Sequence, residues 1–204
     1  MSNPRPDPEQ LLALARAGDG SALGQLFELY HSYLELLARL QIGRRLQGKI
    51  DAVDLVQETF LQAHVRFGQF EGTSEGELVN WLRQILASRL EKMIRQYCGT
   101  QRRDVRLERQ LAVELDQSSR MLDQSLVAPD SSPSKRAARR EQAVLLADAL
   151  RQLPDDYREV LILHHLQGLS MPDVAHRLGR TVDSVKNLWL RGLARLRHLV
   201  GDTP

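Results

Sequence analysis

Helix-starting and helix-stopping residues occur along nearly the whole chain. Between them, apolar residues recur at helical spacing. The pair Asp7-Pro8 can begin a helix that Gly18 ends, and Asp51 can begin another. Alternation typical of strands is not found anywhere. Unbroken apolar runs reach only five residues, whereas a membrane-spanning helix needs about 20. The sequence therefore predicts an all-α protein that does not enter a membrane.

The apolar pattern divides the chain into three parts. Residues 8–97 carry long amphipathic segments and predict one compact helical domain. Apolar periodicity weakens over residues 98–133, so we expect a flexible linker there, partly helical at 104–122. A new helix capped by Ser134 opens a second domain that spans residues 134–200. We therefore expect two small helical domains joined by a linker.

Positive charge gathers near the C-terminus. The chain carries 28 basic and 26 acidic residues, and 24 of the basic ones are arginine. Residues 179–199 hold five basic groups against the single acid Asp183. Arginine suits phosphate and base-edge recognition because its planar fork binds two acceptors at once. A genome rich in G and C would also raise the arginine content, so position is more informative than composition.

The C-terminal segment has the pattern of a helix-turn-helix. Ala175, Gly179 and Val185 have the spacing of a small residue at a helix crossing, a left-handed turn and a buried aliphatic. Ser170 and Thr181 can cap the two helices. A plain helical hairpin with solvated charges is the alternative. The capped helices and the concentrated charge favour DNA binding, with the second helix in the major groove.

Two segments together resemble a known family. Residues 150–197 resemble region four of bacterial sigma factors, and residues 23–97 resemble region two, most closely in DAVDLVQETFLQA (51–63) and WLRQILASRL (81–90). The order of these two domains is that of an extracytoplasmic-function (ECF) sigma factor. The arginine-rich stretch at 99–110 and the long linker are similar to planctomycete members.

The resemblance implies two partners, core RNA polymerase (through its β′ and β subunits) and promoter DNA. Region two of the family docks on a coiled coil of β′, and the matching residues here are Asp54, Leu55, Gln57, Glu58 and Phe60. The acids and glutamine beside an apolar edge suit a basic amphipathic partner. Leu55 and Phe60 can equally be core residues.

The resemblance also implies contacts to the minus-ten region, where bases leave the stack as the duplex opens. The matching residues are Phe70, Asn80, Trp81 and Arg83. Trp81 lies on the apolar stripe of its helix, which favours a core role for it, so Asn80 and Arg83 are the better candidates for strand contact. The loop between Phe70 and Trp81 is longer than is usual in the family, so which loop residue captures a base stays open.

Region four of the family reads the minus-thirty-five element. Side chains expected at base edges or phosphates lie at the start of the last helix and just before it. We assign Lys186, Asn187 and Arg191 to bases, and Arg180, Thr181, Ser184 and Arg195 to phosphates.

No catalytic motif stands out, and we expect no cofactor, no metal site and no enzymatic activity. The six histidines are scattered or adjacent on one helix, and Cys98 is the only cysteine. We expect a cytoplasmic sigma factor that melts promoters with the polymerase, with an anti-sigma factor as a candidate regulator. The alternatives are a stand-alone helix-turn-helix regulator, a polymerase- or sigma-binding interaction protein, and a nucleic-acid enzyme.

Overall fold

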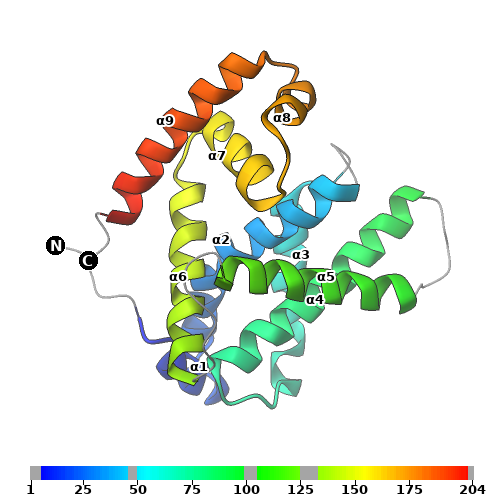
Figure 1. The fold of residues 1–204 in the computed structure, drawn as a ribbon. Coiled ribbons are helices and arrows are strands. Elements are labelled where there is room, and N and C mark those ends of the chain that lie inside the picture. Colours follow the sequence, from blue (N-terminus) through cyan, green and yellow to red (C-terminus); the bar gives the residue numbers. More distant parts are fainter. Residues whose placement is uncertain (1–5, 46–49, 99–104, 125–132, 202–204) are drawn as a thin grey trace. The chain divides into compact units, whose positions relative to one another are not determined.

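A computed structural model describes residues 6–45, 50–98, 105–124 and 133–201. Within these ranges all regular structure is helical and no strand occurs, which confirms the predicted fold class (Figure 1). The chain forms two compact units, Met1–Ser119 and Arg120–Pro204.

The N-terminal unit is built around a long central helix. Its helices are α1 (Pro8–Arg16), α2 (Gly20–Arg45), α3 (Ala52–Arg66), α4 (Glu75–Cys98) and α5 (Val105–Gln124), with a 3-10 turn η1 (Phe67–Gln69). Helix α2 packs against α1, α3 and α4. Fully buried leucines such as Leu26, Leu34 and Leu82 fill the space between these helices. Burial of these side chains stabilises the unit by about 1.5–3 kcal/mol each.

Aspartates set the starts of the first three helices. Asp7 and Asp51 each accept a hydrogen bond from the backbone two residues on, at 3.0 and 2.8 Å, as predicted. Ser21 does not cap α2. Asp19 does so instead, because its carboxylate accepts from the backbone N–H groups of Ser21 and Ala22.

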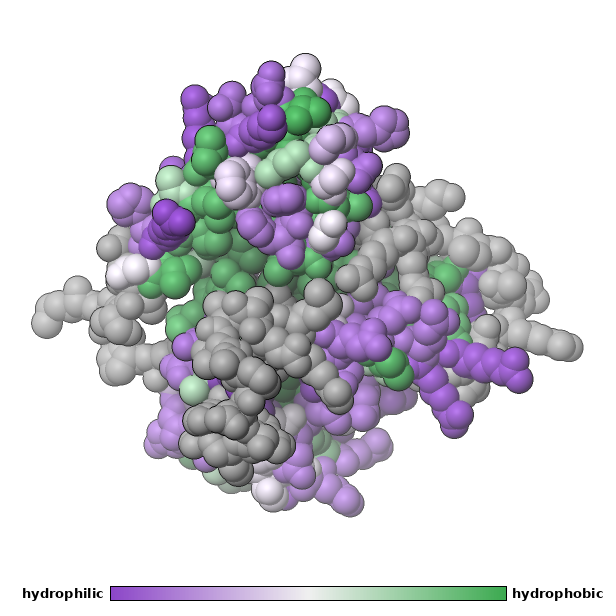
Figure 2. Space-filling model, viewed as in Figure 1, coloured by the Kyte–Doolittle hydropathy of each residue, from purple (hydrophilic) through white to green (hydrophobic). Residues whose placement is uncertain are grey.

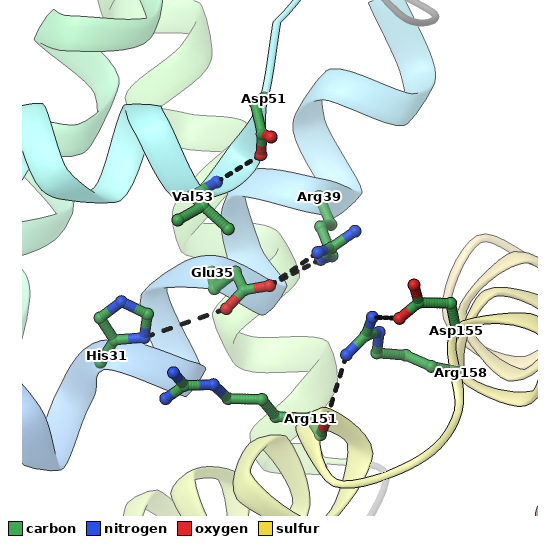
Figure 3. A network of polar contacts seen from close by, with 8 residues as sticks. All are labelled: His31, Glu35, Arg39, Asp51, Val53, Arg151, Asp155 and Arg158. Carbon is green, nitrogen blue, oxygen red and sulfur yellow. Dashed lines mark hydrogen bonds and ion pairs between the residues drawn. The ribbon is translucent and has the colours of Figure 1, made fainter.

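Buried charge on α2 is paired within the helix itself. The Glu35 carboxylate accepts two hydrogen bonds from Arg39, at 2.7 and 2.9 Å, and lies 3.9 Å from the His31 ring (Figure 3). A buried carboxylate without such partners would cost several kcal/mol. The i, i+4 spacing lets α2 keep this acid among apolar neighbours.

Helix α5 corrects the predicted division of the chain. The expected helix at 104–122 is present, but its residues as far as Ser119 belong to the N-terminal unit rather than to a linker. Leu111 and Leu115 are fully buried, and Ser118 accepts a 3.1 Å hydrogen bond from Gln41. These contacts hold the helix, so the flexible linker predicted at 98–133 does not extend through it. The rest of that linker lies mostly outside the described residues.

The C-terminal unit consists of α6 (Pro133–Arg151), α7 (Asp155–Leu161), a π-helical turn η2 (Ile162–Leu166), α8 (Met171–Leu178) and α9 (Val182–Gly201). Helix α9 packs against α6, α7 and α8. Pro154 occupies the cap position of α7 without a side-chain bond, and Asp155 and Asp156 lie in the first turn of the helix. Arg158 holds the turn before α7 instead, donating to the Arg151 carbonyl at 3.1 Å and to Asp155 (Figure 3).

Candidate functional site

A tight turn places α9 across α8, as the sequence predicts. Ser170 caps α8, and Gly179 ends it with a left-handed φ of 61°. The Thr181 hydroxyl then accepts from the Ser184 backbone N–H at 3.2 Å, which caps α9. Ala175 and Val185 are buried together in the core of this unit. The unit therefore contains the helix-turn-helix crossing that exposes one face of α9.

Helices α7 and α9 approach each other closely on the buried side of α9. Gly192 is buried, and a Cβ built on it would lie 3.3 Å from the Tyr157 Cβ and 3.4 Å from a Leu161 methyl. A methyl group there would be tight and would require these α7 side chains to give by a few tenths of an ångström. The distance between α7 and α9 therefore depends on this glycine.

The exposed face of α9 carries most of the predicted DNA contacts. Lys186, Asn187, Arg191 and Arg195 are exposed, and Ser184 is partly buried. Arg180 and Thr181 lie exposed in the turn before α9. The turn and helix thus leave six of the seven predicted residues exposed and Ser184 partly buried. Hydrophilic side chains cover much of the visible surface of this unit, with hydrophobic ones between them (Figure 2).

Two of these basic residues contact acids in the unit. Arg180 donates to Asp156 at 2.8 Å, and the Lys186 ammonium lies 3.8 Å from Asp183. Exposed ion pairs of this kind contribute about 0–1 kcal/mol. Phosphate oxygens can therefore replace the acids at little cost.

Leu190 on α9 was missed by the sequence analysis. Its side chain is 56% exposed, although a leucine within an apolar pattern is expected in the core. The signal was available in the spacing, because Leu190 follows Lys186 and Asn187 by four and three residues.

A histidine pair ties α9 to the π-helical turn. The Trp189 indole donates to His165 Nε2 at 2.7 Å, and the two rings stack with centroids 6.0 Å apart. His164 Nδ1 lies 2.8 Å from the Leu169 carbonyl oxygen, to which it donates. Partial burial, and then the neighbouring His164, lower the pKa of His165 below its usual 6.5.

The predicted polymerase contacts on α3 fall on two faces. Asp54, Gln57 and Glu58 are exposed. Leu55 is 0% exposed and belongs to the core, so its assignment as a contact is wrong. Phe60 is partly buried and stacks on Phe27 with centroids 4.8 Å apart.

The exposed face of α3 continues with two apolar residues that sequence analysis missed. Leu61 is 65% exposed and Val65 is 79% exposed. Asp54, Glu58, Leu61 and Val65 follow one another at spacings of four, three and four residues, so the four side chains form one stripe. We call Asp54, Glu58, Leu61 and Val65 the α3 stripe.

Aromatic side chains gather where α3 leads into α4. The Phe70 and Trp81 rings lie 5.0 Å apart between centroids, and both are close to Phe67. Phe70 and Trp81 are partly buried, so part of each side chain stays exposed. Ser74 and Glu77 form a capping box at the start of α4.

Arg83 and Asn80 differ in their surroundings. Asn80 is exposed. The Arg83 side chain is only 16% exposed, donates to Ser119 and lies 3.6 Å from Asp116 of α5. The Tyr33 hydroxyl also meets Ser119, at 2.7 Å. Arg83 therefore binds α5 in this structure, which the sequence did not indicate.

Two other kinds of feature are absent from the ranges that the structure describes. No three or more His, Cys, Asp and Glu side chains come together there as a group that could hold a metal ion. None of the helices is both long enough and apolar enough to span a bilayer.

Comparison with known proteins gives matches over both units. Residues 143–196 match the family model for sigma-70, region 4. The ECF RNA polymerase sigma factor SigM of Mycobacterium tuberculosis is 30% identical over 192 residues, which are 94% of this chain and 84% of that one. RNA polymerase sigma factor NccH of Alcaligenes xylosoxydans xylosoxydans is 29% identical, covering 98% of this chain and 97% of that one.

A third relative is ECF RNA polymerase sigma factor BldN of Streptomyces coelicolor, 29% identical over 95% of this chain and 66% of that one. A solved structure of an RsbN-BldN complex matches 92% of this chain at 25% identity, with a TM-score of 0.33. With the helix-turn-helix in place, the sequence matches establish that the chain belongs to the ECF RNA polymerase sigma factors, initiation factors that direct RNA polymerase to promoters.

Proposed function

We propose that the N-terminal unit binds core RNA polymerase through the α3 stripe and that the C-terminal unit reads the minus-thirty-five element with α9. The observation that carries the proposal is the exposed basic face of α9, held across α8 by the capped turn at Gly179. A helix presented in this way fits the major groove, and its arginines and lysine meet phosphates and base edges.

The α3 stripe joins two acids to two exposed apolar side chains, Leu61 and Val65. Such a face complements an amphipathic helix with basic residues beside its apolar edge, which is the chemistry expected of the β′ coiled coil. Leu55 and Thr59 point to the opposite, buried side of α3 and fix the orientation of the stripe.

Promoter melting is assigned to the aromatic cluster of Phe67, Phe70 and Trp81 with the neighbouring Asn80. Phe70 and Trp81 are only partly buried and offer aromatic surface on which an unpaired base can stack, and such stacking contributes about 1–3 kcal/mol per base. Arg83 joins the strand contact only after it leaves Ser119 and Asp116. The phosphodiester chemistry belongs to the polymerase, and the chain supplies binding free energy rather than catalytic groups.

The proposal places the protein in the cytoplasm with the polymerase, and includes restraint by an anti-sigma factor, as is common in the family. Purification of the tagged chain from its native cells tests the restraint. A stoichiometric second protein that competes with the polymerase supports it, and recovery of polymerase subunits alone contradicts it.

The central test combines the purified full chain with core polymerase on a promoter library and maps transcript starts. Starts that need both components support the proposal. Specific duplex binding without polymerase affinity would make the chain a stand-alone regulator. Stable polymerase binding without starts would make it an interaction protein.

Variants separate the two surfaces. Glu58→Lys and Leu61→Asp should each lower affinity for the polymerase at least about tenfold, because a central interface residue contributes about 1–2 kcal/mol or more. Glu28→Lys, an exposed acid on α2, is the matched control for charge. Arg195→Ala should leave polymerase binding intact and reduce the salt dependence of promoter binding by about one phosphate contact.

A further inference from the structure

An exposed leucine lies at the centre of the basic face of α9. Asp183, Lys186, Asn187 and Leu190 follow one another at the spacing i, i+3, i+4 and i+7, and all but Asp183 lie well inside the helix. Homeodomain recognition helices read bases with four residues at this spacing. Leu190 therefore occupies a reading position.

The opposite side of α9 explains why Leu190 cannot turn inward. Val185 and Gly192 are buried, and Leu188 and Trp189 pack against the core of the unit. Leu190 lies about half a turn away from Gly192 on a helix of 3.6 residues per turn. Its 56% exposure thus follows from the face of α9 on which it lies.

The surroundings of Leu190 restrict what can cover it. Lys186 and Arg191 are exposed beside it, and Arg195 and Arg197 follow on the next turn. A ligand for this face must present anionic groups around a small apolar one. The major groove of a duplex does this, because phosphates line its edges and the 5-methyl group of thymine projects into it.

We propose that Leu190 is a specificity-determining residue that contacts the methyl group of a thymine in the minus-thirty-five element. This inference rests on the proposed function, in which α9 lies in the major groove. Burial of one methyl group corresponds to about fourfold in affinity.

The test uses holoenzyme made from core polymerase and the full chain. A duplex library randomised at the minus-thirty-five region yields the selected element, and each thymine is then replaced by deoxyuridine, which lacks only the methyl group. Replacement at one position should weaken binding about fourfold. Leu190→Ala should weaken binding to the thymine duplex by the same factor and should not distinguish thymine from deoxyuridine at that position.

Val200→Ala is the matched control, because Val200 is 46% exposed on the same helix but away from this face. It should keep the full preference for thymine. Alanine favours helix, so Leu190→Ala should fold, and its circular dichroism spectrum checks this.

The proposal is overturned if the selected element needs no thymine, if deoxyuridine binds equally well at every position, or if Leu190→Ala still distinguishes the two bases. An equal loss on both duplexes would place Leu190 against something other than the methyl group. Arg191→Ala separates a failure of the thymine contact from a failure of the proposed function. If it weakens promoter binding while Leu190→Ala does not, only the thymine contact is wrong. If holoenzyme selects no element at all, the proposed function itself fails.

Discussion

The Trp189 indole N–H donates to Nε2 of His165 at 2.7 Å, which links α9 to the π-helical turn. Indole nitrogen can only donate, so His165 must be unprotonated at Nε2 for this bond to exist. Protonation of His165 would place an N–H donor at Nε2 opposite the indole N–H donor, and the hydrogen bond would be lost. The bond therefore makes the C-terminal unit sensitive to mild acid.

The pH dependence has a definite sign. Folding lowers the pKa of His165 below 6.5, so the unfolded chain takes up its proton first as the pH falls. The contribution of His165 to stability is present above about pH 6.5 and declines below it, levelling off below the folded-state pKa. The melting temperature of the chain should record this decline between pH 7.5 and 5.5.

His165→Gln tests the assignment, because the glutamine oxygen can accept from the indole without titrating. The variant should lose the part of the pH dependence that belongs to residue 165. His198→Gln, an exposed histidine on α9, should keep it. A profile that is identical in wild type and His165→Gln would contradict the assignment.

The left-handed backbone of Gly179 predicts that a side chain there lowers the free energy of unfolding. Its φ of 61° is left-handed, and a Cβ there would meet nothing within 4 Å. Gly179→Ala should therefore lower the free energy of unfolding by about 1–2 kcal/mol through conformational strain alone. Gly24 on α2 also has open space around it but needs no positive φ.

Gly24→Ala is therefore the matched control, and it should stabilise the chain by about 0.5–1 kcal/mol. Urea unfolding followed by circular dichroism measures both variants. Equal effects of the two substitutions would mean that the left-handed turn is not needed.

Glu77 at the start of α4 predicts a second pH effect, in a more acidic range. Backbone hydrogen bonds from Thr73, then bonds from Ser74, lower the pKa of the Glu77 carboxyl below 4.5. A lowered pKa means that this stabilisation is present above about pH 4.5 and is lost as the pH falls through the folded-state value.

Glu77→Gln should therefore be less stable than wild type at pH 7, and the difference should shrink below pH 4.5. Thermal unfolding at both pH values measures it. Glu28→Gln, another exposed glutamate, should show no such difference. A gap between Glu77→Gln and wild type that persists at pH 3 would rule out the carboxylate as its source.

The hydrogen bonds of Ser119 predict that this serine stabilises the packing of α5. The serine is buried and joins the Tyr33 hydroxyl and the Arg83 guanidinium. Ser119→Ala leaves both without this partner and should lower the free energy of unfolding by about 1–3 kcal/mol. Gln117→Ala, an exposed position on the same helix, should change it by less than about 0.5 kcal/mol. Hydrogen exchange of α5 should accelerate in Ser119→Ala alone, and unchanged exchange would show that the serine does not hold the helix.

Local chemistry explains how much of the fold could be predicted. Asp7, Asp51 and the Ser74–Glu77 box act on residues two to four positions away, so the sequence shows both partners. The position of α5 depends instead on Tyr33 and Gln41, which lie 86 and 77 residues from their serine partners. No local pattern reveals such a pairing.

The candidate sites were likewise predictable only in part from local sequence. Periodicity separated exposed Lys186 and Asn187 from buried Val185 on α9. The same spacing places Leu190 beside Lys186 and Asn187, but neither Leu190 nor Leu61 is assigned to a surface from the sequence, because apolar residues are expected inside unless a partner is known. Leu55 was assigned to the interface from resemblance, although its spacing from Thr59 and Ala63 places it on the buried side of α3.

Gly192 has a consequence for how promoter preference can change. Because Gly192 has no side chain, α9 packs directly on Tyr157 and Leu161 of α7, on the side of α9 opposite its exposed face. A larger side chain at position 192 would push α9 away from α7 and so change the angle at which α9 enters the groove in the proposed function. We therefore expect substitutions at this contact to alter promoter preference without touching a nucleotide.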